Sequence, residues 1–585
     1  MSRSGAGARL GLTAATLVVP VLVLGPVLLH RGYVLVGDMS FVPHQPWKPA
    51  WLGLDGSVPR AVPADAVVSV LGQVVPGDLL QKVVLLATLV AAGAGVLRLT
   101  SRIPDVATPA RLGGAVLYVW NPYVYERLAI GHWGLLVGYA ALPWVVGAAL
   151  DVRRGGASAH ARLFLLLLVA AAGSPTGGLV AGLAAVVVAA GRRRPWSGAL
   201  VLGSVLVVNL PWLVPGALNQ APPGDASGVA AFAARVDTPF GVWGSLLTLG
   251  GIWKTAVVPS ERGTGLLVLV ALLVAVAALV RLAAGSRPGG DGEPVAARRL
   301  LLLAGLAFLL AVVPATGAGE RLVSSLVESV PAAGIWRDSQ KWLQPVALAS
   351  ALGFALLLDG AARRLRRAGL PAAGVGAVAL LPLVLLPGLG WGLAGRLDPV
   401  TYPQEWETVR QVIESQPAAE RRTAVLPWSA YQRLPWNDGR AALDPALRFF
   451  PGQVVVDEDL SISDAVTVRG ADSSEAAIGR ALREHRPLGP ALAGAGVRYL
   501  LVERTAAGAA DVPVPDGATL HAGPELLLVD VGGRAVPTRA PHATTIVAAD
   551  ALTAAGAIAS TVIAIRRKPG GGSATMQAGA VSTTI

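Results

Sequence analysis

The 585-residue sequence contains no cysteine, and only 14% of its residues are charged. The absence of cysteine excludes disulfide bonds, thiolate catalysis, iron–sulfur clusters and cysteine-ligated zinc. Soluble domains usually carry about 25% charged residues. Because 53% of the residues are hydrophobic as well, the composition excludes a soluble globular enzyme. Any chemistry must come from carboxylate, His, Arg, Lys, Tyr and Trp side chains.

Several functional motifs are also missing. The sequence has no Walker loop, no HExxH and no GxSxG. Ionisable residues are scarce inside the apolar segments, Asp550 being the clearest, whereas ion-coupled transporters usually place several there, so transport is disfavoured. The net charge of +12 would suggest nucleic acid in a soluble chain. Here the arginines cluster between apolar segments, so no nucleic-acid partner is expected.

Long apolar runs occupy most of the chain and predict a polytopic, all-α membrane protein. A membrane-spanning helix needs about 20 apolar residues. The first run lacks a signal-peptide cleavage site and is interpreted as an anchor, while the short runs around Pro175 suggest a hairpin that does not cross completely. About twelve transmembrane helices are predicted, at 10–29, 79–99, 107–121, 133–150, 161–174, 177–191, 198–216, 264–283, 299–317, 342–360, 371–391 and 543–565.

The distribution of basic residues predicts the orientation. One set of alternate loops contains more than twice as many Arg and Lys residues as the other set, although its loops are shorter. Basic residues mark cytoplasmic loops. We therefore expect a multi-pass plasma-membrane protein with both termini in the cytoplasm, a transmembrane domain at 1–391, a last transmembrane helix at 543–565 and a disordered cytoplasmic tail at 566–585.

Residues 392–542 differ in character, because charged residues return and the apolar runs shorten to strand length. The pattern predicts a small extracytoplasmic α/β domain. Strands are expected around Val425 and at 454–456, 498–502 and 526–531, and amphipathic helices at 404–415 and 474–486.

The first outer loop supplies a candidate catalytic acid, Asp38, which follows Gly37 shortly after the first apolar run. A carboxylate at the membrane surface, partly desolvated by aromatic neighbours, can act as a general base. An ordinary loop aspartate that caps a helix is the structural alternative.

The second outer loop, from Trp120 to Trp133, places Glu126, Arg127 and His132 among aromatic side chains. These polar groups can orient a phosphate or a sugar hydroxyl. An interfacial aromatic belt with Glu126 paired to Arg127 is the alternative.

Two later outer loops add candidate substrate-binding residues. Trp253 lies in a Gly-Gly-Ile-Trp-Lys segment, and Arg337, Asp338 and Lys341 precede a late apolar run. Arg337 and Lys341 are four residues apart, so on a helix they share a face and can clamp a phosphate. Asp338 is then a salt-bridge partner or a metal ligand, and snorkelling of basic residues at a helix end is the alternative.

The outer domain has two further patterns. A Trp- and Tyr-rich loop that includes Trp428 and Tyr431 suits either sugar stacking or docking onto the membrane part. The acidic run of Asp457, Glu458 and Asp459 can bind a divalent cation, although such runs are usually solvated surface.

Taken together, Gly37–Asp38, the Asn121–Arg127 and Gly131–His132 stretches, Gly251–Trp253, Trp336–Asp338 and a soluble outer domain resemble the GT-C superfamily of membrane glycosyltransferases. Within it, the chain is most similar to the membrane region of actinobacterial α-(1→3)-arabinofuranosyltransferases and related uncharacterised membrane proteins. The resemblance implies a GT-C-like fold, a polyprenyl-phosphate sugar donor and a catalytic acid at Asp38. It also implies that Arg127, His132, Arg337 or Lys341 offsets the charge of the departing phosphate. The loop lacks a paired Asp-x-Asp, so the use of a divalent cation (Mg, Mn or Ca) stays open.

These observations favour a glycosyltransferase that moves a sugar, such as arabinofuranose or mannose, from a polyprenyl-phosphate lipid to an envelope glycan or glycolipid. Two alternatives stay open. One is a non-catalytic envelope-assembly partner with the same fold, and the other is a lipid-linked sugar flippase. Fold analogy alone does not choose among them.

Overall fold

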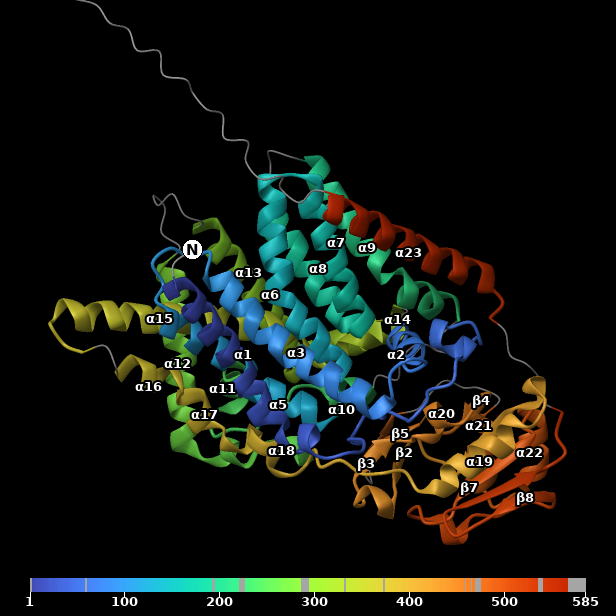
Figure 1. The fold of residues 1–585 in the computed structure, drawn as a ribbon. Helices are drawn as coiled ribbons and strands as arrows, with labels where there is room; N and C mark the ends of the chain where they lie inside the picture. The colour runs from blue at the N-terminus through green and yellow to red at the C-terminus, as the bar shows by residue number, and fades with distance from the viewer. Residues whose placement is uncertain are drawn as a thin grey trace, which may run out of the picture.

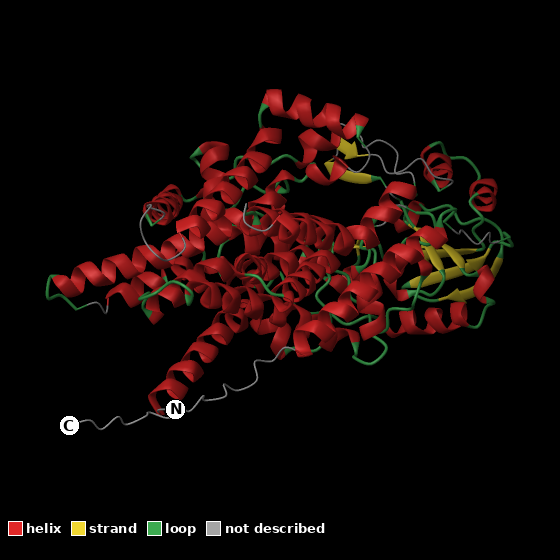
Figure 2. Ribbon diagram, turned by 90° about the horizontal axis from the view of Figure 1, so that it is seen from above, coloured by secondary structure: helices red, strands yellow, loops and turns green. Residues whose placement is uncertain are grey.

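The computed structural model consists of a large helical body with a small sheet-containing domain packed against one end of it (Figure 1). Viewed from above, the main group of strands lies at one side of the helices, and a short separate pair of strands lies apart from it (Figure 2). The structure describes residues 3–57, 60–191, 195–219, 227–285, 294–330, 333–371, 374–457, 459–463, 466–468, 475–534 and 540–566. The predicted tail beyond Arg566 lies outside these residues.

Seven helices in the described part of the chain are long and apolar enough to cross a membrane. This length and composition are those of the spans of a polytopic membrane protein. They are α3 (Gly77–Thr100), α6 (Trp133–Arg154), α9 (Pro195–Leu218), α12 (Gly265–Ala284), α13 (Pro294–Val312), α15 (Gln344–Arg367) and α23 (Ala543–Arg566).

The remaining predicted spans are shorter or broken. The helices α1 (Arg3–Leu29), α4 (Thr108–Val119), α7 (Ala157–Gly173) and α8 (Pro175–Ala189) form, but only α1 exceeds 17 residues. The predicted continuous helix at 371–391 is wrong. It is split into α16 (Gly374–Ala379), α17 (Leu381–Leu385) and α18 (Gly390–Ala394). Pro382 and Pro387 lack an amide hydrogen, and Trp391–Leu393 have positive φ, so the α-helix is interrupted along this segment.

Short elements connect the long helices near the sheet-containing domain. They matter because they bring together polar segments that are far apart in the sequence. They are α2 (Ala64–Leu71), α5 (Pro122–Ala129), α10 (Ser227–Phe232), α11 (Gly241–Leu247), α14 (Gly317–Ser329) and the 3₁₀ turns η1 (Pro49–Leu52), η2 (Thr255–Val257), η3 (Ser260–Gly263), η4 (Val313–Ala315), η5 (Ala333–Trp336), η6 (Ser339–Leu343) and η7 (Pro387–Leu389).

A five-stranded mixed sheet in the order β4-β1-β7-β9-β8 forms the centre of the small domain. The inner strands β1 (Arg422–Leu426) and β7 (Tyr499–Glu503) are buried along their whole length, as expected for strands covered on both faces. The other strands are β4 (Gln453–Val455), β8 (Ala518–Ala522) and β9 (Leu526–Asp530).

Helices cover both faces of this sheet. One face packs against Trp406, Val409 and Ile413 of α19 (Gln404–Glu414), and the other against Ile478 of α21 (Ala476–Arg483) and Leu492 of α22 (Leu488–Gly494). The structure confirms four predicted strands and both predicted helices. The short strands β2 (Tyr431–Arg433), β3 (Ala441–Leu443), β5 (Leu460–Ser463) and β6 (Val466–Val468), and the helix α20 (Ala446–Phe449), were not predicted.

The first outer loop joins the helical body to the small domain through backbone hydrogen bonds. The amide of Gly37 donates to the Ala441 carbonyl at 2.9 Å, and the amide of Leu443 donates to the Gly37 carbonyl at 2.7 Å. Tyr33 and Val400 exchange a second pair of bonds of 2.8 and 2.9 Å. The first outer loop therefore extends the β2–β3 hairpin, and this pairing fixes the position of Asp38.

Candidate functional site

Asp38 lies on the wall of a cavity between the helical body and the small domain. Its carboxylate Oδ2 is 3.2 Å from Nε2 of His132, and its Oδ1 accepts a hydrogen bond from the Tyr431 hydroxyl. The cavity has a volume of about 400 Å³. It is lined by Asp38, Arg60, Ala61, Val62, Ala64, Gly131, His132, Trp133, Gly134, Leu135, Gly173, Ser174, Pro175, Thr176, Ile335, Lys341, Ala430, Tyr431, Leu443 and Arg448.

Two glycines allow the Asp38 turn to pack against the His132 turn. The Asp38 amide donates to the Ile130 carbonyl at 3.0 Å. Gly37 has a φ of +51°, and a Cβ there would lie 1.9 Å from the Ile130 oxygen. Gly131 has a φ of +79°, and a Cβ there would lie 2.1 Å from the Val36 oxygen. Side chains at either position would separate the turns, so these glycines hold the carboxylate beside the imidazole.

The position of Arg127 follows from the way α5 begins. Asn121 caps the helix by accepting a hydrogen bond from the Val124 amide at 3.1 Å, and Pro122 occupies the first helical position. Arg127 then falls in the last turn, and its carbonyl accepts from the His132 amide at 2.8 Å. The Asn-Pro start of the helix thus directs the arginine toward the imidazole.

The guanidinium of Arg127 is fully buried and forms the hub of the site. It makes a bidentate pair with Asp338 at 2.8 and 3.0 Å and donates to Gln340 and to Nδ1 of His132, the latter at 2.9 Å. A guanidinium can only donate, so Nδ1 of His132 must accept. The proton of the neutral imidazole is then on Nε2, where it is donated to Asp38.

These contacts set the charge state of the site. Desolvation acts to raise the pKa of the Asp38 carboxyl, but the hydrogen bonds from His132 and Tyr431 and the positive charge of Lys341 hold it well below its usual range. Desolvation, with the nearby charges of Lys341 and Arg127, lowers the pKa of His132 despite its bond to Asp38. Asp38 is therefore an ionised carboxylate beside a neutral imidazole at neutral pH.

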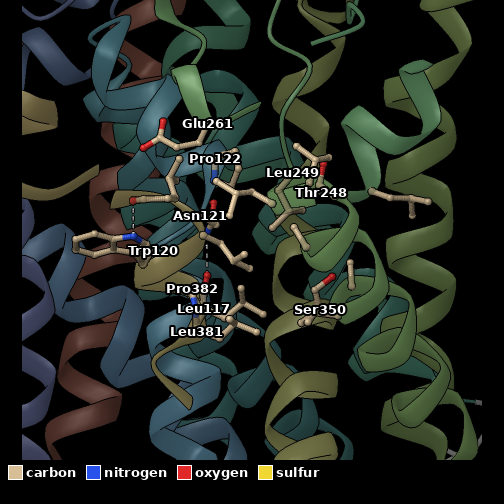
Figure 3. Close-up of a pocket in the computed structure, with 18 of the residues that line it drawn as sticks. Leu117, Trp120, Asn121, Pro122, Thr248, Leu249, Glu261, Ser350, Leu381 and Pro382 are labelled. Atoms are coloured by element: carbon tan, nitrogen blue, oxygen red, sulfur yellow. Dashed lines mark hydrogen bonds between the residues drawn. The ribbon is translucent and has the colours of Figure 1, made fainter. Parts of the chain in front are cut away.

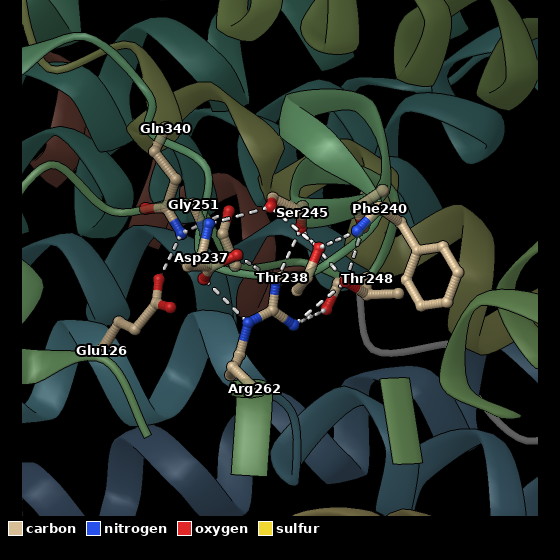
Figure 4. Close-up of polar contacts among 11 residues, drawn as sticks. Glu126, Asp237, Thr238, Phe240, Ser245, Thr248, Gly251, Arg262 and Gln340 are labelled. Atoms are coloured by element: carbon tan, nitrogen blue, oxygen red, sulfur yellow. Dashed lines mark hydrogen bonds and ion pairs between the residues drawn. The ribbon is translucent and has the colours of Figure 1, made fainter. Parts of the chain in front are cut away.

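A second polar layer contains Glu126, Asp237, Arg262 and Gln340 (Figure 4), and Gln340 also accepts a hydrogen bond from Arg127. Gln340 donates to Glu126 at 2.8 Å, and Arg262 makes a bidentate pair with Asp237 at 2.7 Å for both bonds. Burial and the proximity of Asp237 raise the pKa of Glu126 well above its usual value. Glu126 does not line the Asp38 cavity, and Arg127 pairs with Asp338 rather than with Glu126. Glu126 therefore contributes to the site indirectly, through its hydrogen bond with Gln340.

The segment with Arg337 and Lys341 is not an α-helix, so the predicted shared face does not form. The 3₁₀ turns η5 and η6 flank Arg337 and Asp338, and α15 begins only at Gln344. Lys341 lines the Asp38 cavity with its Nζ 3.4 Å from Asp338 Oδ2. The guanidinium of Arg337 instead lies 5.8 Å from the centre of the Phe232 ring, so the structure does not bring the two cations together.

Trp253 packs away from the Asp38 cavity. Its ring meets the edge of the Phe232 ring, with 4.8 Å between centroids, and it is absent from the cavity lining. The preceding Gly251 amide donates to Asp237 at 2.8 Å, which ties this segment to the second polar layer. The predicted substrate contact of Trp253 has no geometric support in this cavity.

Two cavity arginines carried no sequence signal. Arg60 and Arg448 stand alone among unrelated residues, and Arg448 is distant in sequence from the other site residues. In the structure Arg448 is paired with Asp65 through Nε and Nη2 at 3.0 and 3.1 Å, and its buried Nη1 has no hydrogen-bond partner. Both arginines line the cavity that contains Asp38.

A second, mostly apolar cavity lies beside Asn121 and Pro122, at the start of α5 (Figure 3). It is bounded mainly by α4, α12, α15 and α17, and Asn121, Glu261 and Arg262 are among its few polar residues. Arg262 is already bonded to Asp237, Ser245 and Thr248. Arg262 therefore serves local structure.

Within the described residues, no group of three or more His, Asp or Glu side chains is arranged to hold a metal ion. In the acidic run, the Asp459 amide donates to the Asp457 carboxylate at 3.0 Å, and Glu458 lies outside the described residues.

Comparison with known proteins identifies a fold and not a family. No family model and no curated protein matches the sequence. A cryo-EM structure of the arabinofuranosyltransferase AftD from mycobacteria matches with a TM-score of 0.57 and 16% identity, over 90% of this chain and 40% of that chain. A structure of a substituted form of that enzyme matches with a TM-score of 0.56, again at 16% identity, over 90% of this chain and 42% of that chain. The chain thus shares a fold with part of that arabinofuranosyltransferase and spans less than half of its length.

Proposed function

We propose that the protein is a membrane glycosyltransferase. It transfers a sugar, such as arabinofuranose or mannose, from a polyprenyl-phosphate donor to an envelope glycan or glycolipid on the outer face of the plasma membrane. The observation that carries the proposal is Asp38 on the wall of a cavity that also exposes cationic side chains. The likeness to an arabinofuranosyltransferase fold supports the same chemistry. A GT-C arrangement with twelve crossings and cytoplasmic termini belongs to this proposal.

Asp38 is the catalytic base in this mechanism. A carboxylate has about four lone-pair positions, and His132 and Tyr431 each donate one hydrogen bond to it. Positions therefore remain for an acceptor hydroxyl. As the hydroxyl oxygen attacks the anomeric carbon, its proton passes to Asp38 and the bond to the donor phosphate breaks. Direct displacement inverts the anomeric configuration.

The cationic side of the cavity stabilises the departing polyprenyl phosphate. Lys341 and Arg60 line the cavity, and Nη1 of Arg448 is buried there without a partner. An orphaned guanidinium N–H is costly unless it meets an acceptor. A phosphate oxygen is the acceptor that this group fits, and charge-assisted bonds to it stabilise the transition state.

The direct test compares wild type with Asp38→Asn in reconstituted membranes, using polyprenyl-phosphate pentose and hexose donors with an envelope glycan acceptor. We expect transfer by wild type, and in the variant retained donor binding with transfer reduced by about 10²–10⁴-fold. Asp55→Asn, in the same loop and bonded to Ser57, is the matched control and should transfer normally.

The alternatives give different results in this assay. Donor binding without transfer by wild type or variant would contradict the enzyme and favour an assembly partner. Movement of the donor between leaflets without a new glycosidic bond would favour a flippase. A non-catalytic assembly partner with the same fold would have the same hydrogen bonds between the first outer loop and the small domain. These bonds are therefore compatible with both hypotheses.

A further inference from the structure

A separate cavity lies at the opposite end of the helical body from Asp38. It has a volume of about 320 Å³ and is lined by Gly95, Arg98, Leu99, Arg102, Pro143, Trp144, Gly147, Ala148, Asp151, Arg162, Leu165 and Leu166. The helix α6 begins beside the Asp38 cavity at Trp133 and ends beside this one at Arg154. Its 22 residues rise by about 33 Å. On α6 the lining of the first cavity ends at Leu135 and that of the second begins at Pro143 and runs to Asp151, so the two cavities lie toward opposite ends of this helix.

The lining combines cations with an apolar floor. Asp151 is the one carboxylate in it, and its charge is neutralised by a bidentate pair with Arg102 at 2.8 and 3.0 Å and by Arg154 at 3.4 Å. Arg98 lies 5.9 Å over the Trp144 ring, and Arg162 donates to the carbonyl of Ser158 in its own helix at 3.2 Å. Arg162 also acts on Asp151 electrostatically, but among the described lining residues one carboxylate faces Arg98, Arg102 and Arg162, so the cavity keeps a net positive charge.

Small residues allow the helices to approach each other closely around the cavity. At Gly95 a Cβ would lie 2.6 Å from Pro143 and 2.7 Å from the Trp144 indole nitrogen. At Gly147 a Cβ would meet the Arg102 guanidinium at 3.5 Å. The Trp144 indole donates to the Ala91 carbonyl at 2.9 Å, so the aromatic wall is fixed. The cavity is thus a built feature of α3, α6 and α7.

We propose that this cavity binds the phosphate headgroup of an anionic phospholipid, with the glycerol and the first acyl carbons against the apolar floor. Its position at the end of three membrane helices places it at the depth of lipid headgroups. Basic pockets between transmembrane helices are suited to such headgroups. Arg98 and Arg162 supply charge-assisted hydrogen bonds to the phosphate. This site is independent of the proposed transfer reaction, because α6 separates it from the Asp38 cavity.

Native mass spectrometry of the full-length protein, titrated with phosphatidylglycerol, tests the site. In the double variant Arg98→Gln/Arg162→Gln, we expect the dissociation constant of the most tightly bound lipid to rise roughly 30-fold. Each arginine near an anionic lipid surface contributes about 1 kcal/mol to binding, and the loss of two corresponds to about that change. Gly147→Leu keeps every charge and fills the cavity, and it should weaken the same binding at least about tenfold. The matched control is Arg366→Gln/Arg367→Gln, which removes two exposed charges from the last turn of α15 and none from the cavity lining.

The outcomes separate the sources of binding. Equal affinity for phosphatidylcholine, or unchanged affinity in both cavity variants, would overturn the proposal. Displacement of the lipid by glycerol 1-phosphate at equal concentration would also overturn it, and would assign the cavity to a soluble phosphate ester. Melting temperatures that match wild type confirm that each variant is folded. If Gly147→Leu fails to fold, the arginine variant still decides the question.

Discussion

The carboxylate of Asp38 and the imidazole of His132 are 3.2 Å apart, and this contact defines the charge state of the site. Arg127 occupies Nδ1 of the imidazole, so Nε2 donates to the carboxylate. A carboxylate held by such donors stays ionised at neutral pH. The four predictions below test this arrangement and the packing that supports it.

Tyr431→Phe should shift the acidic limb of the transfer-rate profile to higher pH. The tyrosine hydroxyl donates to Asp38 and lowers the pKa of its carboxyl, so its loss raises that pKa. Transfer requires the ionised form and fails as pH falls through the pKa, so the variant should lose activity at a higher pH than wild type. Rates measured from pH 3 to 8 check this. Tyr402→Phe, which removes a hydroxyl bonded to Phe41, should leave the limb unchanged.

Gly37→Ala should abolish transfer and lower the melting temperature. A methyl group would lie 1.9 Å from the Ile130 oxygen, and the backbone has a φ of +51°. Strain of this kind costs on the order of 1–3 kcal/mol before the clash is counted. Gly241→Ala has a similar φ of +67° with nothing within 4 Å, and it isolates the backbone cost. Equal effects of the two substitutions would show that the Asp38 turn does not need close packing.

Arg127→Gln should destabilise the protein by about 3–5 kcal/mol, because it leaves Asp338 buried without its bidentate partner. Removing both charges in Arg127→Gln/Asp338→Asn should recover part of that loss. Melting temperatures of the two single variants and the double variant form a cycle that measures the coupling. Additive losses would mean that the pair contributes independently. Arg154→Gln, on an exposed pair, should be nearly neutral.

Asp444→Asn should stabilise the small domain above neutral pH. Asp444 and Glu503 are both fully buried, and desolvation raises the pKa of Asp444 to about 7. Between the unfolded value and about 7, the folded state holds a proton that the unfolded state has lost, so stability falls as pH rises. An amide removes this dependence, with a gain on the order of 1–3 kcal/mol at pH 8.

Unfolding of wild type and Asp444→Asn at pH 5 and pH 8 provides the measurement. The difference between the two proteins should be larger at pH 8. The Ala446 amide, which bonds the Asp444 carboxylate at 2.8 Å, can bond the amide oxygen of the variant in the same way. A larger stabilisation at pH 5 than at pH 8 would contradict a raised pKa of Asp444 in the folded protein.

Local sequence properties predicted a substantial part of the fold. Apolar length gave the seven long helices, and short apolar runs between polar segments gave β1, β4, β7 and β9. Run length and periodicity depend only on residues that are close in the sequence, so they can be read from the sequence directly. The broken segment at 371–391 was mispredicted because hydropathy is insensitive to the proline and left-handed positions that turn the chain.

The candidate site was only partly predictable. Gly37–Asp38 and Gly131–His132 were distinctive as local motifs, and the structure brings them together. Arg60 and Arg448 lie in no recognisable motif, although both line the cavity. Tyr431, which bonds Asp38, belonged to an aromatic loop that suited either sugar stacking or docking onto the membrane part. Their convergence depends on how the small domain packs on the helices, which no local periodicity encodes.

The sequence by itself determined that this is a polytopic membrane protein with a small α/β domain, and that Asp38 and His132 are chemically prominent. Only the tertiary structure decided that Tyr431 reaches Asp38 and that Lys341, not Arg337, enters the cavity. The physical reason is that burial and backbone propensity act on neighbouring residues, whereas the distance between two polar side chains far apart in the chain is set by the packing of whole helices and sheets.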